Sequence, residues 1–85
     1  MMRVKPKLRE DHMQDALYIF DEETGYIFEL NSTAALIWDM IKEGLSEEEI
    51  FKKLREIFGE DDSKIMSDLD NFIRKLLEYH LITKE

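Results

Sequence analysis

Residues 26–38 read Tyr26-Ile-Phe-Glu-Leu-Asn-Ser-Thr-Ala-Ala-Leu-Ile-Trp38, and within them a two-residue hydrophobic period changes to a helical one. Tyr26, Phe28 and Leu30 occupy alternate positions, as in a half-buried strand. Asn31 then offers a side-chain oxygen to the free N–H groups of a helix start. The apolar residues that follow have helical spacing: Ala34, Ile37, Trp38 and Ile41. The stretch therefore predicts a strand that runs directly into a helix.

The residues before this stretch predict further strands. Residues 16–20 are rich in strand-forming side chains, and the segment 21–25 separates them from the strand at 26–30. Gly25 suits the left-handed position at the end of a hairpin turn, so we expect an antiparallel hairpin. Residues 4–8 are expected to form a short edge strand, because Pro6 is tolerated where no ladder donor is needed.

The residues after the stretch predict three helices. The first covers residues 31–43 and ends at Gly44, and Ser46 and Glu49 then match a capping box that starts the second. Gly59 ends the second helix, and the third covers residues 63–79, followed by a short extended tail at 81–82. Two apolar sets are expected to face the core: Ile50, Phe51, Leu54, Ile57 and Phe58 in the second helix, and Ile65, Leu69, Phe72, Ile73, Leu76 and Leu77 in the third.

The order of elements predicts an α+β fold. A three-stranded antiparallel sheet comes first and three helices follow, so the parts are winged-helix-like, with the hairpin placed N-terminal to the helices. Eighty-five residues with 44% apolar content suit a single domain over residues 1–85. Trp38 is expected in its core.

Composition excludes several classes of protein. There is no cysteine, which removes disulfides and thiolate sites and fits a reducing compartment. The longest apolar run, residues 34–38, is far shorter than a membrane helix, so we expect a soluble, cytoplasmic protein without a membrane partner. The net charge is −8, and four of the twelve basic residues lie in the first nine positions, which leaves 8 − 20 = −12 for the remainder. Such a body disfavours nucleic acid.

Neither a metal site nor a catalytic site is expected. The acidic runs 47–49 and 60–62 stand at helix starts, where the macrodipole favours them without a metal. His12 and His80 are far apart in sequence, with no nucleophile or ligand pattern nearby. We therefore expect no cofactor and no enzymatic activity.

Several short motifs, in this order and spacing, resemble one known family. They are the turn at Gly25, Phe28-Glu-Leu-Asn31, Ala34-Ala35 with Ile37-Trp38, Gly44-Leu-Ser46 before Glu49-Ile50 and Leu54, and then Asp68, Phe72, Leu76 and Leu81-Ile82. In these the chain is similar to the PqqD-like proteins, small peptide-binding modules also called RiPP recognition elements. It departs from their pattern at His80, where glycine is frequent, and in its basic N-terminus with Pro6.

The resemblance implies a non-catalytic peptide chaperone. Such modules hold the N-terminal leader of a ribosomally made precursor peptide and present it to a modifying enzyme: a radical SAM enzyme, a cyclodehydratase or a leader peptidase. The leader adds as a strand beside the last strand of the sheet and lies along the third helix. The residues themselves fit this mode, since the strand at 26–30 has an open edge in a meander and the apolar arc of the third helix is unusually wide.

The candidate peptide-binding residues come from these two elements. The strand contributes Tyr26, Ile27, Phe28, Glu29 and Leu30, and the helix contributes Asp68, Asn71, Phe72 and Lys75. Ladder pairing is expected from the strand, an apolar pocket from Phe72 with Tyr79, and selection of charge from Asp68 and Lys75. The other flank of the helix, with Met66, Asp70 and Leu77, remains an alternative. Taken singly, Phe28, Leu30 and Phe72 fit core positions as well.

Two other functions stay open. The second and third predicted helices imitate a helix-turn-helix, but the third has Lys64, Arg74 and Lys75 against Asp68, Asp70 and Glu78. This balance argues against a DNA recognition helix. The open strand edge would also allow a homodimer or a plain interaction domain.

Overall fold

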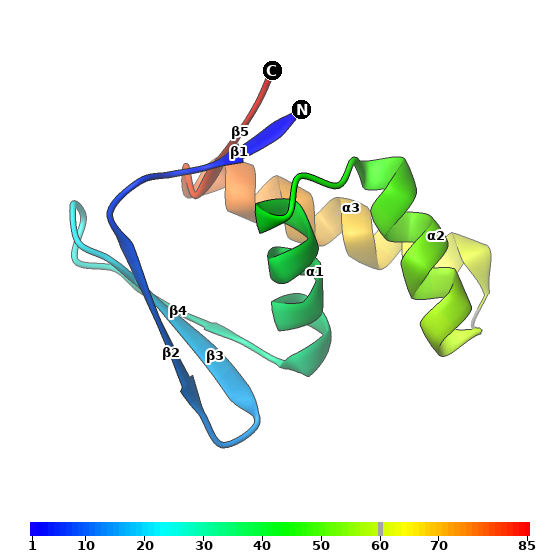
Figure 1. Ribbon diagram of the computed structural model, residues 1–85, viewed down its shortest axis with the longest axis horizontal. Helices are drawn as coiled ribbons and strands as arrows, with labels where there is room; N and C mark the ends of the chain where they lie inside the picture. The colour runs from blue at the N-terminus through cyan, green and yellow to red at the C-terminus, as the bar shows by residue number, and fades with distance from the viewer. Residues whose placement is uncertain (60) are drawn as a thin grey trace.

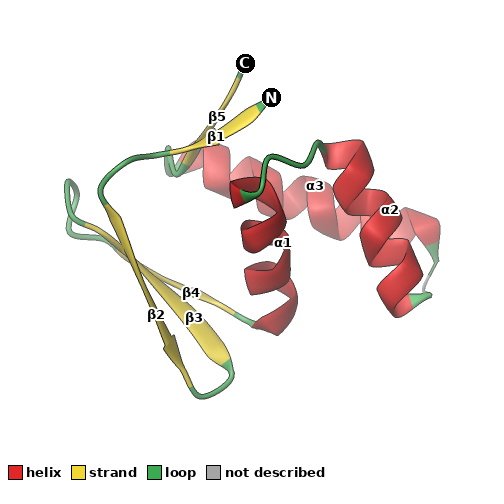
Figure 2. Ribbon diagram, viewed as in Figure 1, coloured by secondary structure: helices red, strands yellow, loops and turns green. Residues whose placement is uncertain are grey.

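The computed structural model describes residues 1–59 and 61–85, and it confirms the α+β class. A three-stranded antiparallel sheet of order β2-β3-β4 is followed by three helices, which lie together on one side of it (Figures 1 and 2). A second, two-stranded sheet pairs β1 with β5. The bounds are β1 Met2–Val4, β2 Leu8–Met13, β3 Ala16–Asp21, β4 Ile27–Leu30, α1 Ser32–Lys42, α2 Glu47–Phe58, α3 Asp62–Glu78 and β5 Ile82–Lys84.

The junction between β4 and α1 forms as its sequence predicts. Asn31 has an extended backbone (φ −70°, ψ 177°), and its Oδ1 accepts a hydrogen bond of 2.9 Å from the backbone N–H of Ala34. This bond satisfies one of the N–H groups that a helix start leaves without an intrahelical partner. The end of the sheet and the first turn of α1 are thereby fixed to each other.

The prediction of a strand at residues 4–8 is wrong. Lys7 has a φ of 63°, and a bend at Pro6 and Lys7 separates β1 from β2. The first strand of the larger sheet begins at Leu8 instead and pairs with β3 from Leu8↔Asp21 to Met13↔Ala16. Proline lacks the N–H and lysine at positive φ leaves the β region, so both residues interrupt a ladder.

The extended tail after α3 is confirmed, and its partner is β1. Val4 pairs with Ile82, and Met2 with Lys84. Leu81 and Ile82 are buried, which anchors this small sheet beside the C-terminal end of α3 (Figure 1). The tail therefore does not occupy the edge of β4.

The helix ends confirm the capping signals. Gly44 (φ 91°) follows α1, and the next residue donates its N–H to Met40 O in a Schellman motif. Ser46 and Glu49 form both bonds of the capping box of α2. His80 takes the left-handed position after α3 with a φ of 60°, in the place where glycine is preferred. The chain thus reverses sharply after α3.

The core lies between the sheet and the helices. Trp38 is fully buried, as predicted, and its Nε1 donates a 3.0 Å hydrogen bond to Glu10, which also accepts from Lys42. Ile57 and Phe58 do not face the core as expected, since they are 56% and 43% exposed. The buried apolar residues are Met2, Leu17, Ile19, Leu30, Ile37, Trp38, Met40, Ile41, Ile50, Leu54, Ile65, Leu69, Ile73, Leu76, Leu81 and Ile82; Phe51, Phe72 and Leu77 pack against them half-buried.

Candidate functional site: the edge of β4 and its groove

The strand β4 lies at the edge of the three-stranded sheet. It pairs with β3 from Leu17↔Leu30 to Phe20↔Ile27, and within residues 1–59 and 61–85 no strand pairs with its other side. The backbone N–H and C=O groups on that side are therefore open to a further strand.

The register shows which residues present these groups. Asp21 donates its N–H to Tyr26 O at 2.9 Å, which makes this pair a hydrogen-bonded one. Bonded and non-bonded pairs alternate in an antiparallel ladder. Phe28 and Leu30 therefore direct their main-chain groups to β3, whereas Ile27 and Glu29 direct theirs to the open edge.

A buried carboxylate holds the hairpin that positions β4. The side chain of Asp21 accepts hydrogen bonds from Lys5 Nζ at 2.9 Å and from the N–H groups of Glu23 and Thr24 at 3.0 and 3.4 Å. The bond from Lys5, against the opposing effect of burial, lowers the pKa of Asp21 below its ordinary value. Gly25 completes the turn with a φ of 79°, which a residue with a Cβ would adopt only under strain. The start of β4 is thus tied to the segment before β2.

A groove of about 350 Å³ lies between β4 and α3. Most of its lining is apolar, and six of the predicted site residues belong to it: Ile27, Phe28, Glu29, Leu30, Phe72 and Lys75. Of these, Leu30 is also a buried core residue. The remaining lining residues are Asn31, Ala34, Leu76, Tyr79 and Leu81. We call this cavity the β4–α3 groove.

An aromatic cluster stands at one end of the β4–α3 groove. The ring centroids of Tyr26 and Tyr79 lie 5.3–6.4 Å from each other and from that of Phe28, in edge-on geometry. Tyr26 is 57% exposed and Tyr79 is 46% exposed. Aromatic side chains with this much exposure are typical of contact surfaces, because a large ring buries much area on binding and loses little side-chain entropy.

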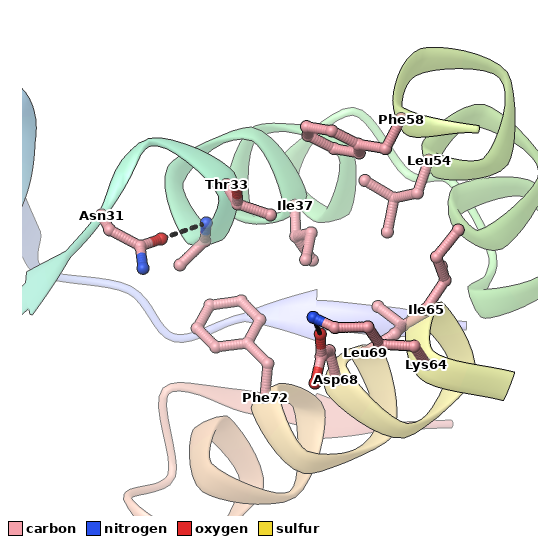
Figure 3. Close-up of a pocket in the computed structure, with 11 residues that line it drawn as sticks. Asn31, Thr33, Ile37, Leu54, Phe58, Lys64, Ile65, Asp68, Leu69 and Phe72 are labelled. Carbon is pink, nitrogen blue, oxygen red and sulfur yellow. Dashed lines mark hydrogen bonds and ion pairs between the residues drawn. The ribbon is translucent and has the colours of Figure 1, made fainter. Parts of the chain in front are cut away.

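The remaining predicted residues are placed differently. Asp68 lies beside a second cavity, between the three helices, where it pairs with Lys64 at 3.8 Å (Figure 3). Asn71 lines neither cavity. The alternative flank of α3, with Met66, Asp70 and Leu77, also lines neither cavity. The flank with Phe72 and Lys75 is the one that faces the groove.

Sequence reasoning did not select several residues of the groove. Asn31 and Ala34 belong to it because α1 starts where β4 ends, although Asn31 was interpreted as a cap alone. Leu81 reaches it because the turn at His80 folds the chain back. The sequence signals for these residues are the cap at Asn31 and the end of α3 at His80, because the chain changes direction beside the groove at both positions.

Two observations bear on a metal site and on a membrane span. Residues 1–59 and 61–85 contain no group of three or more His, Cys, Asp or Glu side chains that could hold a metal ion. Asp61 caps α3 and Glu49 belongs to the capping box of α2, as acids at helix starts do; Glu60 lies outside the described residues. Among the described residues, no helix has the length and apolar character to cross a bilayer.

Comparison with known proteins gives a family and two solved structures. The family model "Coenzyme PQQ synthesis protein D (PqqD)" matches residues 17–82. No curated protein matches the chain. "TbiB1 in Complex with the TbiA(beta) Leader Peptide" has a TM-score of 0.87 at 24% identity, over 98% of this chain and 96% of that chain. "Lasso peptide synthetase B1 complexed with the leader peptide" has a TM-score of 0.87 at 20% identity, over 98% of both chains.

Proposed function

This chain belongs to the PqqD family, and from this premise we propose that it binds the leader segment of a ribosomally synthesised precursor peptide. The two structures with the same fold are complexes with leader peptides, which supports the proposal. The protein itself catalyses no reaction. It presents the bound precursor to a modifying enzyme, such as a radical SAM enzyme, a cyclodehydratase or a leader peptidase.

The observation that carries the proposal is the open edge of β4 beside an apolar groove. A peptide that adds here as a strand gains main-chain hydrogen bonds with Ile27 and Glu29, and these bonds do not depend on its sequence. Its alternate side chains then face the groove, where they are selected. Leader binding needs both properties, affinity from the main chain and choice from the pockets.

The proposed roles of the side chains follow from their positions. Phe28 and Phe72 form the apolar surface of the groove, and Tyr79 extends it toward Tyr26. Lys75 stands on its rim and makes no ion pair within the described residues, so it is the cation that selects an acidic group on the peptide. Asp68 contacts the peptide further along α3, at the second cavity. Asn71 lines neither cavity, so its contact with the peptide is confined to the outer margin of the groove.

The helix-turn-helix alternative loses support from the ion pairs of α3. Lys64 pairs with Asp68 at 3.8 Å and Arg74 with Asp70 at 3.1 Å. Cations neutralised on their own helix release few counterions from a phosphate backbone. We therefore propose peptide, and not nucleic acid, as the ligand.

The proposal is tested by binding of a fluorescein-labelled leader, encoded by a precursor gene next to the gene of this protein. Fluorescence anisotropy should show saturable binding at about micromolar protein, and unlabelled leader should compete. A peptide of the same composition in scrambled order is the control. Equal anisotropy for both peptides, or no saturation, would refute the proposal. Light scattering separates the homodimer alternative, which predicts a dimer that the leader does not dissociate.

A further inference from the structure

The β4–α3 groove does not end where β4 ends. A second cavity, also of about 350 Å³, lies between α1, α2 and α3, and we call it the helix pocket. It shares Asn31, Ala34 and Phe72 with the β4–α3 groove. In Figure 3 the ring of Phe72 rises from α3 toward α1 beside the helix pocket. The two cavities therefore adjoin at these residues, and together their lining follows α3 from Lys64 to Tyr79.

The walls of the helix pocket suit an apolar side chain. Its base is formed by core residues of all three helices, and the exposed Phe58 of α2 stands at its margin (Figure 3). The polar members are exposed and lie at the rim: Asn31, Thr33, Lys64 and Asp68. The core residues of the base are Ile37, Leu54, Ile65 and Leu69. Because these base residues are buried, the accessible apolar surface of the pocket belongs mainly to Phe58, Phe72 and Ala34 around it. Covering such surface releases water from it, which favours contact with an apolar side chain.

The dimensions connect the helix pocket to a peptide on β4. The lining residues of α3 run from Lys64 to Tyr79, which is about 22 Å at the rise of an α-helix. An extended peptide covers this distance with about seven residues. β4 offers only four residues, Ile27–Leu30, for pairing. About three residues of such a peptide therefore extend past β4 and alongside the helix pocket.

We propose that the helix pocket anchors one large apolar side chain of the same leader peptide, about three or four residues beyond the segment that pairs with β4. This inference rests on the proposed function. The leader is the occupant because the two cavities adjoin at Asn31, Ala34 and Phe72, so that a peptide paired with β4 and prolonged past Leu30 passes beside the helix pocket. At about 350 Å³ the pocket is in the lower range of small-ligand sites, which is room for one large side chain with its backbone.

The test uses a displayed library of fifteen-residue peptides, randomised at every position, selected against the immobilised chain. Thr33→Trp fills the helix pocket, whereas Ser32→Trp, also exposed in the first turn of α1, lines neither cavity. A second pair is Phe58→Ala and Ile57→Ala, two neighbours on α2 of similar exposure, of which Phe58 alone lines the pocket.

Enriched peptides should share an apolar position outside the paired segment. They should bind Thr33→Trp about ten- to hundredfold more weakly than Ser32→Trp, the effect of losing one buried large side chain. Replacing that apolar position by alanine should weaken binding to the wild-type chain by the same factor and binding to Thr33→Trp hardly at all. Phe58→Ala should bind more weakly than Ile57→Ala.

The outcomes separate the two proposals. If the peptides lose affinity for a variant with a blocked β4 edge, such as Ile27→Pro, but bind Thr33→Trp and Ser32→Trp equally, the helix pocket is no anchor while the proposed function stands. If no peptide is enriched, or the enriched peptides ignore the β4 edge, both proposals are overturned. Circular dichroism of each variant confirms that it is folded before its affinity is compared.

Discussion

Ile27→Pro is the substitution that removes a donor from the open edge with the least damage to the fold. Ile27 is the first residue of β4, its side chain is 63% exposed, and its N–H faces away from β3 by the alternation of the ladder. Proline is tolerated at the first residue of a strand and on edge strands. Ile27→Ala is the matched control, because it removes the same side chain and keeps the N–H.

The magnitude follows from one main-chain hydrogen bond and the space that the ring occupies. A net contribution of about 0.5–1.5 kcal/mol for the bond, with some displacement of the added strand by the ring, gives about 1–2 kcal/mol. The Kd of the leader should therefore rise about five- to thirtyfold relative to Ile27→Ala. Phe28→Pro, by contrast, removes a bond to β3, leaves a β3 carbonyl without its donor and should cost about 1–3 kcal/mol of folding stability.

Fluorescence anisotropy with the labelled leader measures the affinities, and urea unfolding measures the stability of the same samples. We expect Ile27→Pro and Ile27→Ala to differ by less than about 1 kcal/mol in unfolding free energy. Equal leader affinity for these two variants, both folded, would refute strand addition at β4. A loss of affinity with Ile27→Ala as large as that with Ile27→Pro would assign the binding to the side chain instead.

Three further substitutions test the fold that supports the site. Burial acts to raise the pKa of Glu10, but hydrogen bonds from Lys42 and Trp38 outweigh it and lower the pKa below its ordinary value. The ionised carboxylate therefore stabilises the fold above its unfolded pKa, and this stabilisation is lost as the pH falls through the folded value. Glu10→Gln should lower the unfolding free energy by about 1 kcal/mol at neutral pH and by almost nothing near pH 2, in urea titrations at both pH values; an equal loss at both would contradict the assignment. His80→Gly relieves the strain of a left-handed backbone and should stabilise the chain by about 0.5–1 kcal/mol. Gly44 has the equivalent position after α1, and a Cβ added there would meet no atom within 4 Å. Gly44→Ala should therefore destabilise the chain by about 1 kcal/mol through its positive φ alone. Thermal unfolding measures both, and a lower melting temperature for His80→Gly would show that the imidazole contributes more than the strain costs.

The elements that the sequence predicted correctly are fixed by local signals. Asn31 and the Ser46–Glu49 capping box each act within three residues, and Gly25 acts within one turn. Such interactions are visible in sequence because both partners lie in the same short window. The strand-to-helix junction and the hairpin follow from them directly.

β2 was missed because its stabilising partners are distant in sequence. Its residues, Leu8–Met13, are mostly charged and show no apolar alternation. Glu10 accepts hydrogen bonds from Trp38 and Lys42, 28 and 32 residues away, so a charged side chain takes the place that an apolar residue has in other strands. No pattern in the first fifteen residues shows that these partners are present.

The site was predictable to the extent that it depends on chain order. A meander leaves β4 with an open edge, and the wide apolar arc of α3 indicated a surface without a helix partner. The helix pocket, however, depends on how α1, α2 and α3 pack. The helical spacing predicted Phe58 in the core, whereas it is exposed at the margin of this pocket. The placement of Asp68 at this pocket, away from the β4–α3 groove, has the same origin.

Amide hydrogen exchange, measured residue by residue with and without saturating leader, tests strand addition at β4 most directly. In the free protein the amides of Phe28 and Leu30 should be protected by β3, while those of Ile27 and Glu29 should exchange rapidly. Leader binding should slow the exchange of Ile27 and Glu29 and leave the alternation otherwise unchanged. Rapid exchange of both amides in the saturated complex would contradict the account.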